Sequence, residues 1–210
     1  MAATLKQQIY NAIWEGIVNG EYRADHVFNE KTLVEKYQVS KSPVRDALIE
    51  LCSDGVLRSI PRYGYEIVQI SNKQLQEIIR LRALIEVDNL EMMVGRISPE
   101  QIAQIKAHIL ETDRKLENGT LTVRNHWENN IAFHKMLYSM SNNQFGASLL
   151  DRCLKAETMA YSMYCLYTVE QNDLLDSKGH WAIVNCMEQS DREGAAAALR
   201  KDLESISLAL

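Results

Sequence analysis

The sequence contains no long apolar run, little proline and no closely spaced pair of cysteines. Its 210 residues include only three prolines, Pro43, Pro61 and Pro99. Because no run of about 18 apolar residues occurs, a membrane-spanning helix is not expected. The first ten residues, MAATLKQQIY, lack the apolar segment of a secretory signal peptide. The four cysteines form no C-x-x-C pair, so reduced thiols and a cytoplasmic location are expected.

An excess of positive charge is also lacking. The formal net charge is −5 at pH 7, which by itself argues against binding to nucleic acid. Residues 1–70 hold eight Lys or Arg and nine Asp or Glu, so this part is not basic either. Between Lys36 and Arg62, however, five basic residues stand against three acidic ones. Any contact with nucleic acid must therefore come from a local cluster.

The apolar periodicity changes character near Ser71. The first part predicts helices at 5–19, 30–37 and 42–53 and short strands at 56–60 and 65–70. The second part predicts helices at 72–94, 98–118, 121–141, 143–168, 173–189 and 191–208. The fold class is therefore mostly α. We expect an N-terminal winged helix-turn-helix domain with a small β hairpin at 1–71, and a C-terminal all-α antiparallel helical bundle at 72–210.

The stretch VSKSPVRDAL suits a helix that begins at a DNA groove. Ser40 or Ser42 can cap the helix and reach phosphate, and the restriction on a residue before proline slightly favours Ser42 as the cap. Pro43 fits the first turn because its missing N–H is not needed there. Lys41 adds charge towards phosphate, and Arg45 can donate two hydrogen bonds to guanine.

The hairpin that follows has the features of a wing. Arg62 and Tyr63 fall at its tip, and Gly64 allows close approach to the minor groove or the backbone. The alternative is an ordinary helix start followed by a solvated charged face. Taken together, the helix start and the hairpin favour DNA binding over that alternative.

The segment LVEKYQVSKSPVRDALIELCSDGVLRSIPRYGYEIV resembles the DNA-binding domain of GntR-type bacterial transcription regulators. Over about 65 residues nearly every position of the family pattern has a counterpart. The resemblance implies DNA contacts at Lys31, Ser40, Lys41, Ser42, Arg45, Arg62, Tyr63 and Gly64. Lys31 and Lys41 stand where arginine is commoner, and lysine keeps the charge without the planar fork.

Residues 71–210 resemble the all-helical FCD effector domain of the FadR subgroup. The segments that carry this resemblance are RALIE, NNIAFHKMLYSMSNN and HWAIVNCMEQSDREGAAAALRKDLE. Many such domains hold a divalent metal ion between helices. The matching positions here are Asn130, His134, His180 and Asp202, with Asn130 in place of an aspartate and Asp202 in place of a histidine. Zinc is the expected ion, since it accepts imidazole and carboxylate ligands.

The spacing of these four residues is compatible with one shared site. Asn130 and His134 are four residues apart and share a helix face. His180 and Asp202 flank the turn at Ser190, and on antiparallel helices both would lie roughly 16–17 Å from it, level with each other. A polar cluster without metal, in which Asp202 satisfies His134, is the alternative.

The family resemblance also implies a small organic or sugar acid as effector. Arg82 is the candidate to bind its carboxylate, and an ion pair with Glu86, four residues along the helix, is the competing role. The expected function is a homodimeric repressor that binds a pseudo-palindromic site in double-stranded DNA and responds to that effector. The alternatives are a regulator that binds its ligand without metal, and a metalloenzyme that uses His134, His180 and Asp202. Against the enzyme, no H-E-x-x-H motif and no glycine-rich phosphate loop occur.

Overall fold

The computed structural model describes residues 3–164 and 176–209. The chain divides into two compact units. The first comprises residues 1–75 and the end of helix α7 (Gln144–Tyr164) from Lys155, and the second comprises residues 76–154 and the C-terminal helices. Within the described residues, no helix combines the length and the apolar character needed to cross a bilayer.

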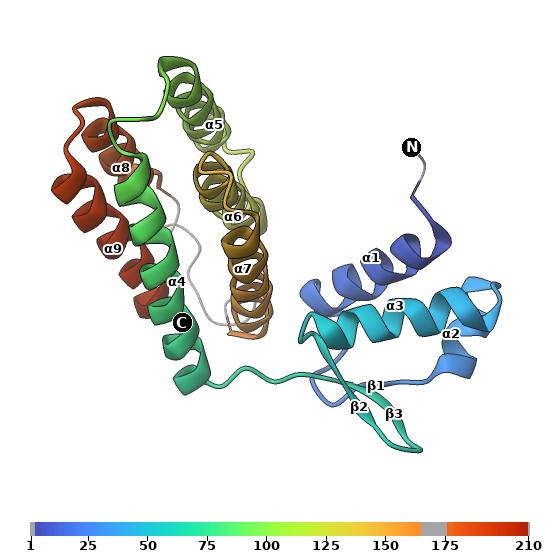
Figure 1. Ribbon diagram of the computed structural model, residues 1–210. Helices are drawn as coiled ribbons and strands as arrows, with labels where there is room; N and C mark the ends of the chain where they lie inside the picture. Colours follow the sequence, from blue (N-terminus) through green and yellow to red (C-terminus); the bar gives the residue numbers. More distant parts are fainter. Residues whose placement is uncertain (1–2, 165–175, 210) are drawn as a thin grey trace. The chain divides into compact units, whose positions relative to one another are not determined.

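Residues 3–71 of the first unit form three helices and three short strands (Figure 1). In chain order they are α1 (Leu5–Val18), β1 (Val27–Phe28), α2 (Glu30–Tyr37), α3 (Lys41–Ser53), β2 (Leu57–Ile60) and β3 (Gly64–Ile67). Helix α1 packs on α3, because both carry apolar residues at helical spacing. Ile13, Val44 and Leu48 are fully buried between them. The β2–β3 hairpin projects beyond the helices (Figure 1).

The sheet has one strand more than the sequence predicted. Residues Val27 and Phe28 form β1, which pairs antiparallel with β3, so the strand order is β1-β3-β2. Tyr65 on β3 lies opposite Phe28 on one side and Ser59 on the other. The sequence predicted strands only at 56–60 and 65–70, which form a two-stranded hairpin. A two-residue strand carries almost no periodic signal, and β1 is defined by its partner rather than by its own sequence.

Helix α3 begins one residue earlier than predicted. Ser40 is the N-cap, although its side chain makes no capping hydrogen bond, and the slight preference for Ser42 as the cap was wrong. Ser42 lies inside the first turn, where its hydroxyl donates to the Asp46 carboxylate at 3.3 Å. The steric restriction before Pro43 therefore did not prevent a helical residue at this position.

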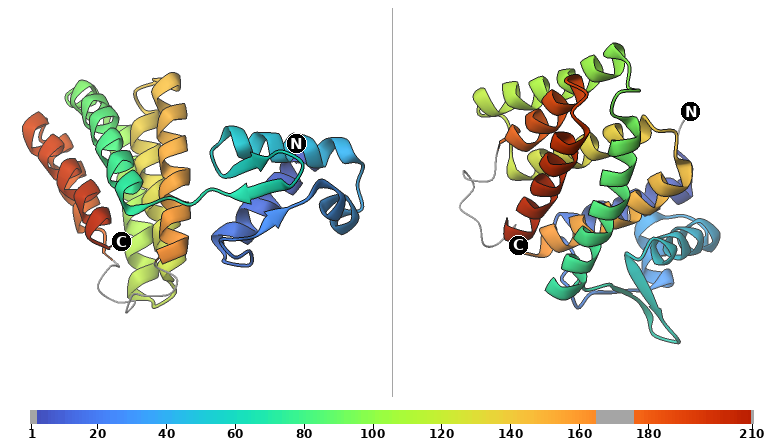
Figure 2. Two further views of the ribbon diagram at one scale, coloured as in Figure 1. Left: turned by 90° about the horizontal axis from the view of Figure 1, so that it is seen from below. Right: turned by 60° about the vertical axis from the view of Figure 1, so that its left-hand side comes forward.

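The second unit is built from antiparallel helices. They are α4 (Asn72–Met93), α5 (Pro99–Glu117), α6 (Val123–Ser139), the first part of α7, α8 (Lys178–Glu188) and α9 (Arg192–Ala209). Figures 1 and 2 show α4 beside the α8–α9 pair, and α6 packs against α8, where Phe133 stacks on His180. Helix α5 starts one residue later than the predicted residue 98, with Ser98 and Gln101 forming a reciprocal capping box around Pro99. The predicted start of α8 at residue 173, and the predicted end of α7 at 168, lie outside the described residues.

Candidate nucleic-acid interface and candidate metal centre

Helix α3 exposes the side chains that the sequence singled out. Ser40, Lys41, Ser42 and Arg45 are all exposed. The opposite face of the helix holds Val44, which is fully buried. The apolar residues therefore fix α3 against the core of the first unit and leave its first turn open to solvent, as a helix that reads a DNA groove requires.

The tip of the β2–β3 hairpin is also exposed. Arg62 has a left-handed backbone, with φ of 66°, and the Tyr63 side chain is 66% exposed. Gly64 has φ of 143°, and a Cβ atom there would collide with the carbonyl oxygen of Phe28. Glycine is therefore required where β3 passes β1. The close approach that it allows fixes the position of the exposed Arg62 and Tyr63 just before it.

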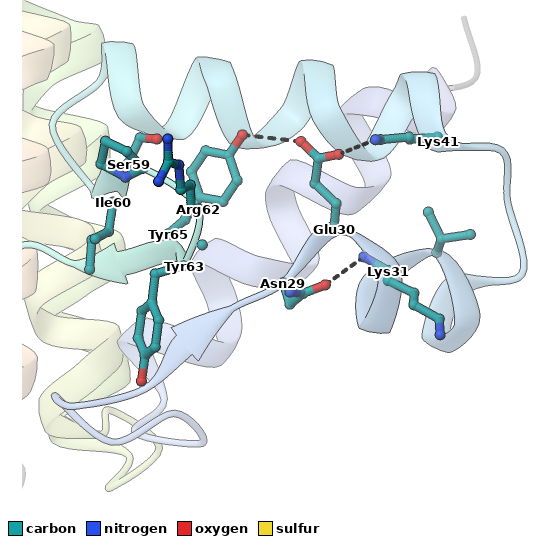
Figure 3. A pocket seen from close by; sticks show the side chains of 12 residues that line it. Asn29, Glu30, Lys31, Lys41, Ser59, Ile60, Arg62, Tyr63 and Tyr65 are labelled. Atoms are coloured by element: carbon teal, nitrogen blue, oxygen red, sulfur yellow. Dashed lines mark hydrogen bonds and ion pairs between the residues drawn. The ribbon is translucent and has the colours of Figure 1, made fainter.

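An open cleft of about 600 Å³ lies between the start of α2, the start of α3 and the hairpin. Of the predicted DNA-contacting residues, Lys31, Lys41, Arg62, Tyr63 and Gly64 line it (Figure 3). The structure thus brings together residues that are up to 33 positions apart in the sequence. The other three predicted residues lie on the exposed side of α3 or at its N-cap.

Glu30, the first residue of α2, is a cleft residue that the sequence analysis missed. Its carboxylate accepts a hydrogen bond from the Tyr65 hydroxyl at 3.2 Å and forms an ion pair with Lys41 at 3.0 Å (Figure 3). The hydrogen bond from Lys41 lowers the pKa of Glu30, against the weaker effect of burial. An acid at a helix start is common, so only the folded arrangement shows that Glu30 faces Lys41.

The four predicted metal ligands lie together in the second unit. The Nε2 atom of His134 on α6 lies 3.3 Å from Oδ2 of Asp202 on α9. The Nε2 atom of His180 on α8 lies 3.9 Å from Oδ1 of Asp202 and 3.3 Å from the Asn130 amide nitrogen. His134 is fully buried and His180 is 8% exposed. The sequence prediction that His180 and Asp202 lie level across the α8–α9 turn is confirmed.

A buried row of charged groups contacts the Nδ1 side of the His134 ring. Its Nδ1 atom donates to Oε2 of Glu86 at 2.7 Å, and Nε of Arg82 donates to the other Glu86 oxygen at 2.6 Å. Arg82 is fully buried and Glu86 is 3% exposed. Since a bond at Nδ1 leaves Nε2 to face Asp202, Glu86 fixes the orientation of the ring. Sequence spacing gave no sign of this contact between residues 48 positions apart.

The two histidines differ in protonation. Burial, the largest single effect, lowers the pKa of His134, but the combined effects of Glu86 and Asp202 outweigh it and raise the pKa to about 9. Burial dominates at His180 and lowers its pKa to about 3, despite Asp202. Burial raises the pKa of Glu86, but the charges of Arg82 and His134 lower it to about 2. His180 is therefore neutral, whereas His134 holds a proton that a metal ion would have to displace.

The cluster fits a divalent metal ion such as zinc. Ligand atoms about 2.0–2.2 Å from zinc lie roughly 3.4 Å apart in a tetrahedral site, close to the 3.3 Å between His134 and Asp202. Despite that short distance, these two atoms do not meet hydrogen-bond geometry. Within the described residues, His134 Nε2, Asp202 Oδ2 and Asn130 Oδ1 are buried without a hydrogen-bond partner. Rotating the Asn130 amide by half a turn would present its oxygen to the same point.

Arg82, the predicted effector ligand, forms the i, i+4 ion pair with Glu86 that was its competing role. Its binding to an effector stays a prediction. Two smaller cavities of the second unit, of about 330 and 230 Å³, lie near the α4–α5 turn and are not lined by the cluster residues.

Two family models match the chain. Residues 77–205 match the FCD domain, and residues 5–67 match the model described as bacterial regulatory proteins, gntR family. These two matches correspond to the helical second unit and to the unit that carries the exposed α3 and hairpin. The fold class predicted from the sequence is confirmed.

Individual proteins similar to this chain agree with the two family models. The chain is 29% identical over 144 residues to an uncharacterized HTH-type transcriptional regulator, YdhC of Bacillus subtilis, which covers 69% of this chain and 64% of that protein. That alignment spans less than two thirds of the relative. This chain is also 23% identical to the HTH-type transcriptional repressor RspR of Escherichia coli, over 97% of this chain and 87% of RspR. The solved structure of E. coli McbR/YncC has the same fold, with a TM-score of 0.79 and 20% identity over 97% of this chain and 95% of that one.

Proposed function

This chain belongs to the GntR family of bacterial regulatory proteins and carries an FCD domain, and from that premise we propose that it represses transcription as a homodimer bound to a pseudo-palindromic DNA site. The family makes it a DNA-binding transcription regulator rather than an enzyme. The relative RspR is named a transcriptional repressor, which supports repression rather than activation. The observation that carries the proposal is the exposed leading turn of α3 beside the exposed hairpin tip.

Selection of bound DNA from random duplexes tests the DNA part of the proposal. A two-fold dimer should enrich inverted repeats whose half-site centres lie about 10 base pairs, or a multiple of that, apart. A selection that enriches no motif, from protein that is folded by circular dichroism, would contradict it. In a reporter strain, deletion of the gene should raise expression from the selected site if the protein is a repressor, and lower it if it is an activator.

The homodimer is supported by an exposed apolar stripe on α4. Leu81, Leu84 and Met92 are 44%, 68% and 54% exposed, and their spacing places them on one face of the helix. Clustered exposed apolar side chains of this kind mark interaction surfaces. Leu84→Glu should convert the dimer to a monomer in sedimentation velocity. Leu110→Glu, at a 57% exposed position on α5, is the matched control and should remain dimeric.

We also propose that a divalent metal ion, zinc first, occupies the cluster of Asn130, His134, His180 and Asp202. The matched geometry and the buried atoms without partners support it. Elemental analysis of protein purified without chelators should find about one ion per chain. Absence of metal, even after incubation with zinc, would favour the alternative regulator that binds its ligand without metal.

The effector is proposed to be a small carboxylic or sugar acid bound in the helical domain. A carboxylate could bind the metal ion or, after breaking the Glu86 pair, the Arg82 guanidinium. Melting curves of the zinc-loaded protein with hydroxy acids and sugar acids, each compared with its uncharged alcohol or amide, test this class. A shift that requires the carboxylate, together with weaker binding to the selected DNA, is expected. Equal shifts with the uncharged compounds would contradict it.

A further inference from the structure

The DNA-facing cleft contains one carboxylate among several cations. Lys31, Lys41 and Arg62 line the cleft, and Glu30 is the one acid among the described residues that do so. An acid here opposes the attraction of phosphate. Its position therefore calls for an explanation beyond the helix-start preference of acidic residues.

Glu30 connects the three elements that form the interface. It is the first residue of α2, it pairs with the first residue of α3, Lys41, and it accepts from Tyr65 on β3. Figure 3 shows its carboxylate between these two partners. The Glu30 side chain is 23% exposed, whereas Lys41 is 71% exposed. The acid is thus held in place while the lysine that it contacts remains open to solvent.

This arrangement leaves Lys41 able to bind phosphate. A lysine ammonium has three donors, and the contact with Glu30 uses one of them. An ion pair as exposed as this one is weak, so a phosphate oxygen can share or replace it. Glu30 therefore favours one direction of the Lys41 side chain without withdrawing it from DNA.

The charge of Glu30 acts differently on specific and non-specific binding. Non-specific binding comes almost entirely from attraction between cations and phosphates, and a carboxylate 3.0 Å from Lys41 offsets part of that attraction on every sequence. In the specific complex, a lysine already biased towards one direction loses less freedom when it meets its phosphate. We propose that Glu30 is a specificity-determining residue, which positions Lys41 and weakens binding to DNA outside the target site.

Removal of the charge tests the proposal in the full-length protein. The affinities of wild type and Glu30→Gln are measured for a fluorescent random-sequence 30-base-pair duplex and for the selected site, at several salt concentrations. Glu30→Gln should bind the random duplex more tightly, with a plot of log K against log salt steeper by about 0.9, the value of one added phosphate contact. In Glu30→Gln, the ratio of specific to non-specific affinity, taken relative to the wild-type ratio, should fall by roughly threefold when the salt concentration is lowered from 200 to 50 mM, as that slope implies.

Glu35→Gln is the matched control. Glu35 lies on the same helix, is exposed, and gives the same change of net charge. It should leave the salt slope and the affinity ratio at the wild-type values. If Glu30→Gln and Glu35→Gln have equal effects, net charge alone explains the change and the proposal is overturned.

A double-mutant cycle tests whether Glu30 acts through Lys41. In a Lys41→Gln background, Glu30→Gln should no longer change the salt slope or the affinity ratio. The same change in both backgrounds would overturn the proposed partnership. If Glu30→Gln loses its helical circular dichroism, Glu30→Asp replaces it, since the shorter acid cannot reach both partners and the affinity ratio should again fall.

This inference rests on DNA binding, and the two can fail separately. Wild-type protein that selects no DNA would remove the proposed target site. Wild-type protein that selects a site, with Glu30→Gln indistinguishable from Glu35→Gln, would remove only the role of Glu30.

Discussion

The Asp202 carboxylate occupies the space that a side chain at Gly179 would need. A Cβ atom at position 179 would collide with Oδ1 of Asp202, which is the oxygen that faces His180. The glycine therefore allows α9 to bring its carboxylate alongside α8, next to the histidine that follows Gly179 in the sequence. The close approach of Asp202 to His180, and with it the proposed metal site, depends on this missing side chain.

Gly179→Ala should weaken zinc binding although every proposed ligand remains. The methyl group would displace the Asp202 carboxylate, and disturbing the surroundings of a metal ligand typically costs about 10–100-fold in affinity. Competition with a chromophoric chelator measures the change. Asn185→Ala, at an exposed position of α8, is the control and should bind zinc as wild type does. Equal affinities for Gly179→Ala and wild type would contradict the role of Gly179 in placing the Asp202 carboxylate.

Regular helix geometry predicted two parts of the cluster, whose four residues the family resemblance had identified. Two helices joined by a short turn keep His180 and Asp202 level, and one helix turn keeps Asn130 and His134 on one face. The contact between Glu86 and His134 could not be predicted in this way. It joins α4 to α6, and no spacing rule relates two helices that are not consecutive.

In the first unit the same distinction holds. Helix α3 and its exposed face followed from periodicity, whereas β1 and the contact of Glu30 with Lys41 depend on how separate elements meet. The choice between Ser40 and Ser42 failed for a local reason. The steric rule for a residue before proline favoured Ser42 as the cap, but the helix begins at Lys41, so Ser42 lies inside its first turn.

Gly64→Ala should destabilise the DNA-binding unit more than Gly55→Ala does. Both glycines have positive φ, 143° and 75°, but only a Cβ at position 64 meets a neighbouring atom, the carbonyl oxygen of Phe28. Backbone strain costs about 1–3 kcal/mol at such positions, and the collision adds to that cost at position 64. Urea unfolding of both variants measures the difference. Equal losses of stability would show that β3 can move away from β1 without cost.

Arg45→Ala and Lys41→Gln should weaken DNA binding in different ways. If Arg45 reads a base, its loss should cost about 1–3 kcal/mol on the selected site and relax the preference at one position. If Lys41 contacts phosphate, its loss should weaken binding to all sequences and reduce the salt slope by about 0.9. Titrations of the selected site and its single-base variants measure both effects. Arg23→Gln, at a position paired with Asp25, should change neither, and a uniform loss with Arg45→Ala would remove its reading role.

Zinc should stabilise the wild-type protein and not His180→Gln. A ligand that binds only the folded state at a concentration 100 times its Kd adds about 2.7 kcal/mol of stability. For a chain of this size that corresponds to a rise in Tm of roughly 5–10 °C. The comparison uses the zinc-induced change in Tm, because loss of the His180 ring also removes its stacking on Phe133, with ring centroids 3.7 Å apart. His126→Gln, outside the cluster, should keep the full rise, whereas a rise of equal size in His180→Gln would place zinc at some other site.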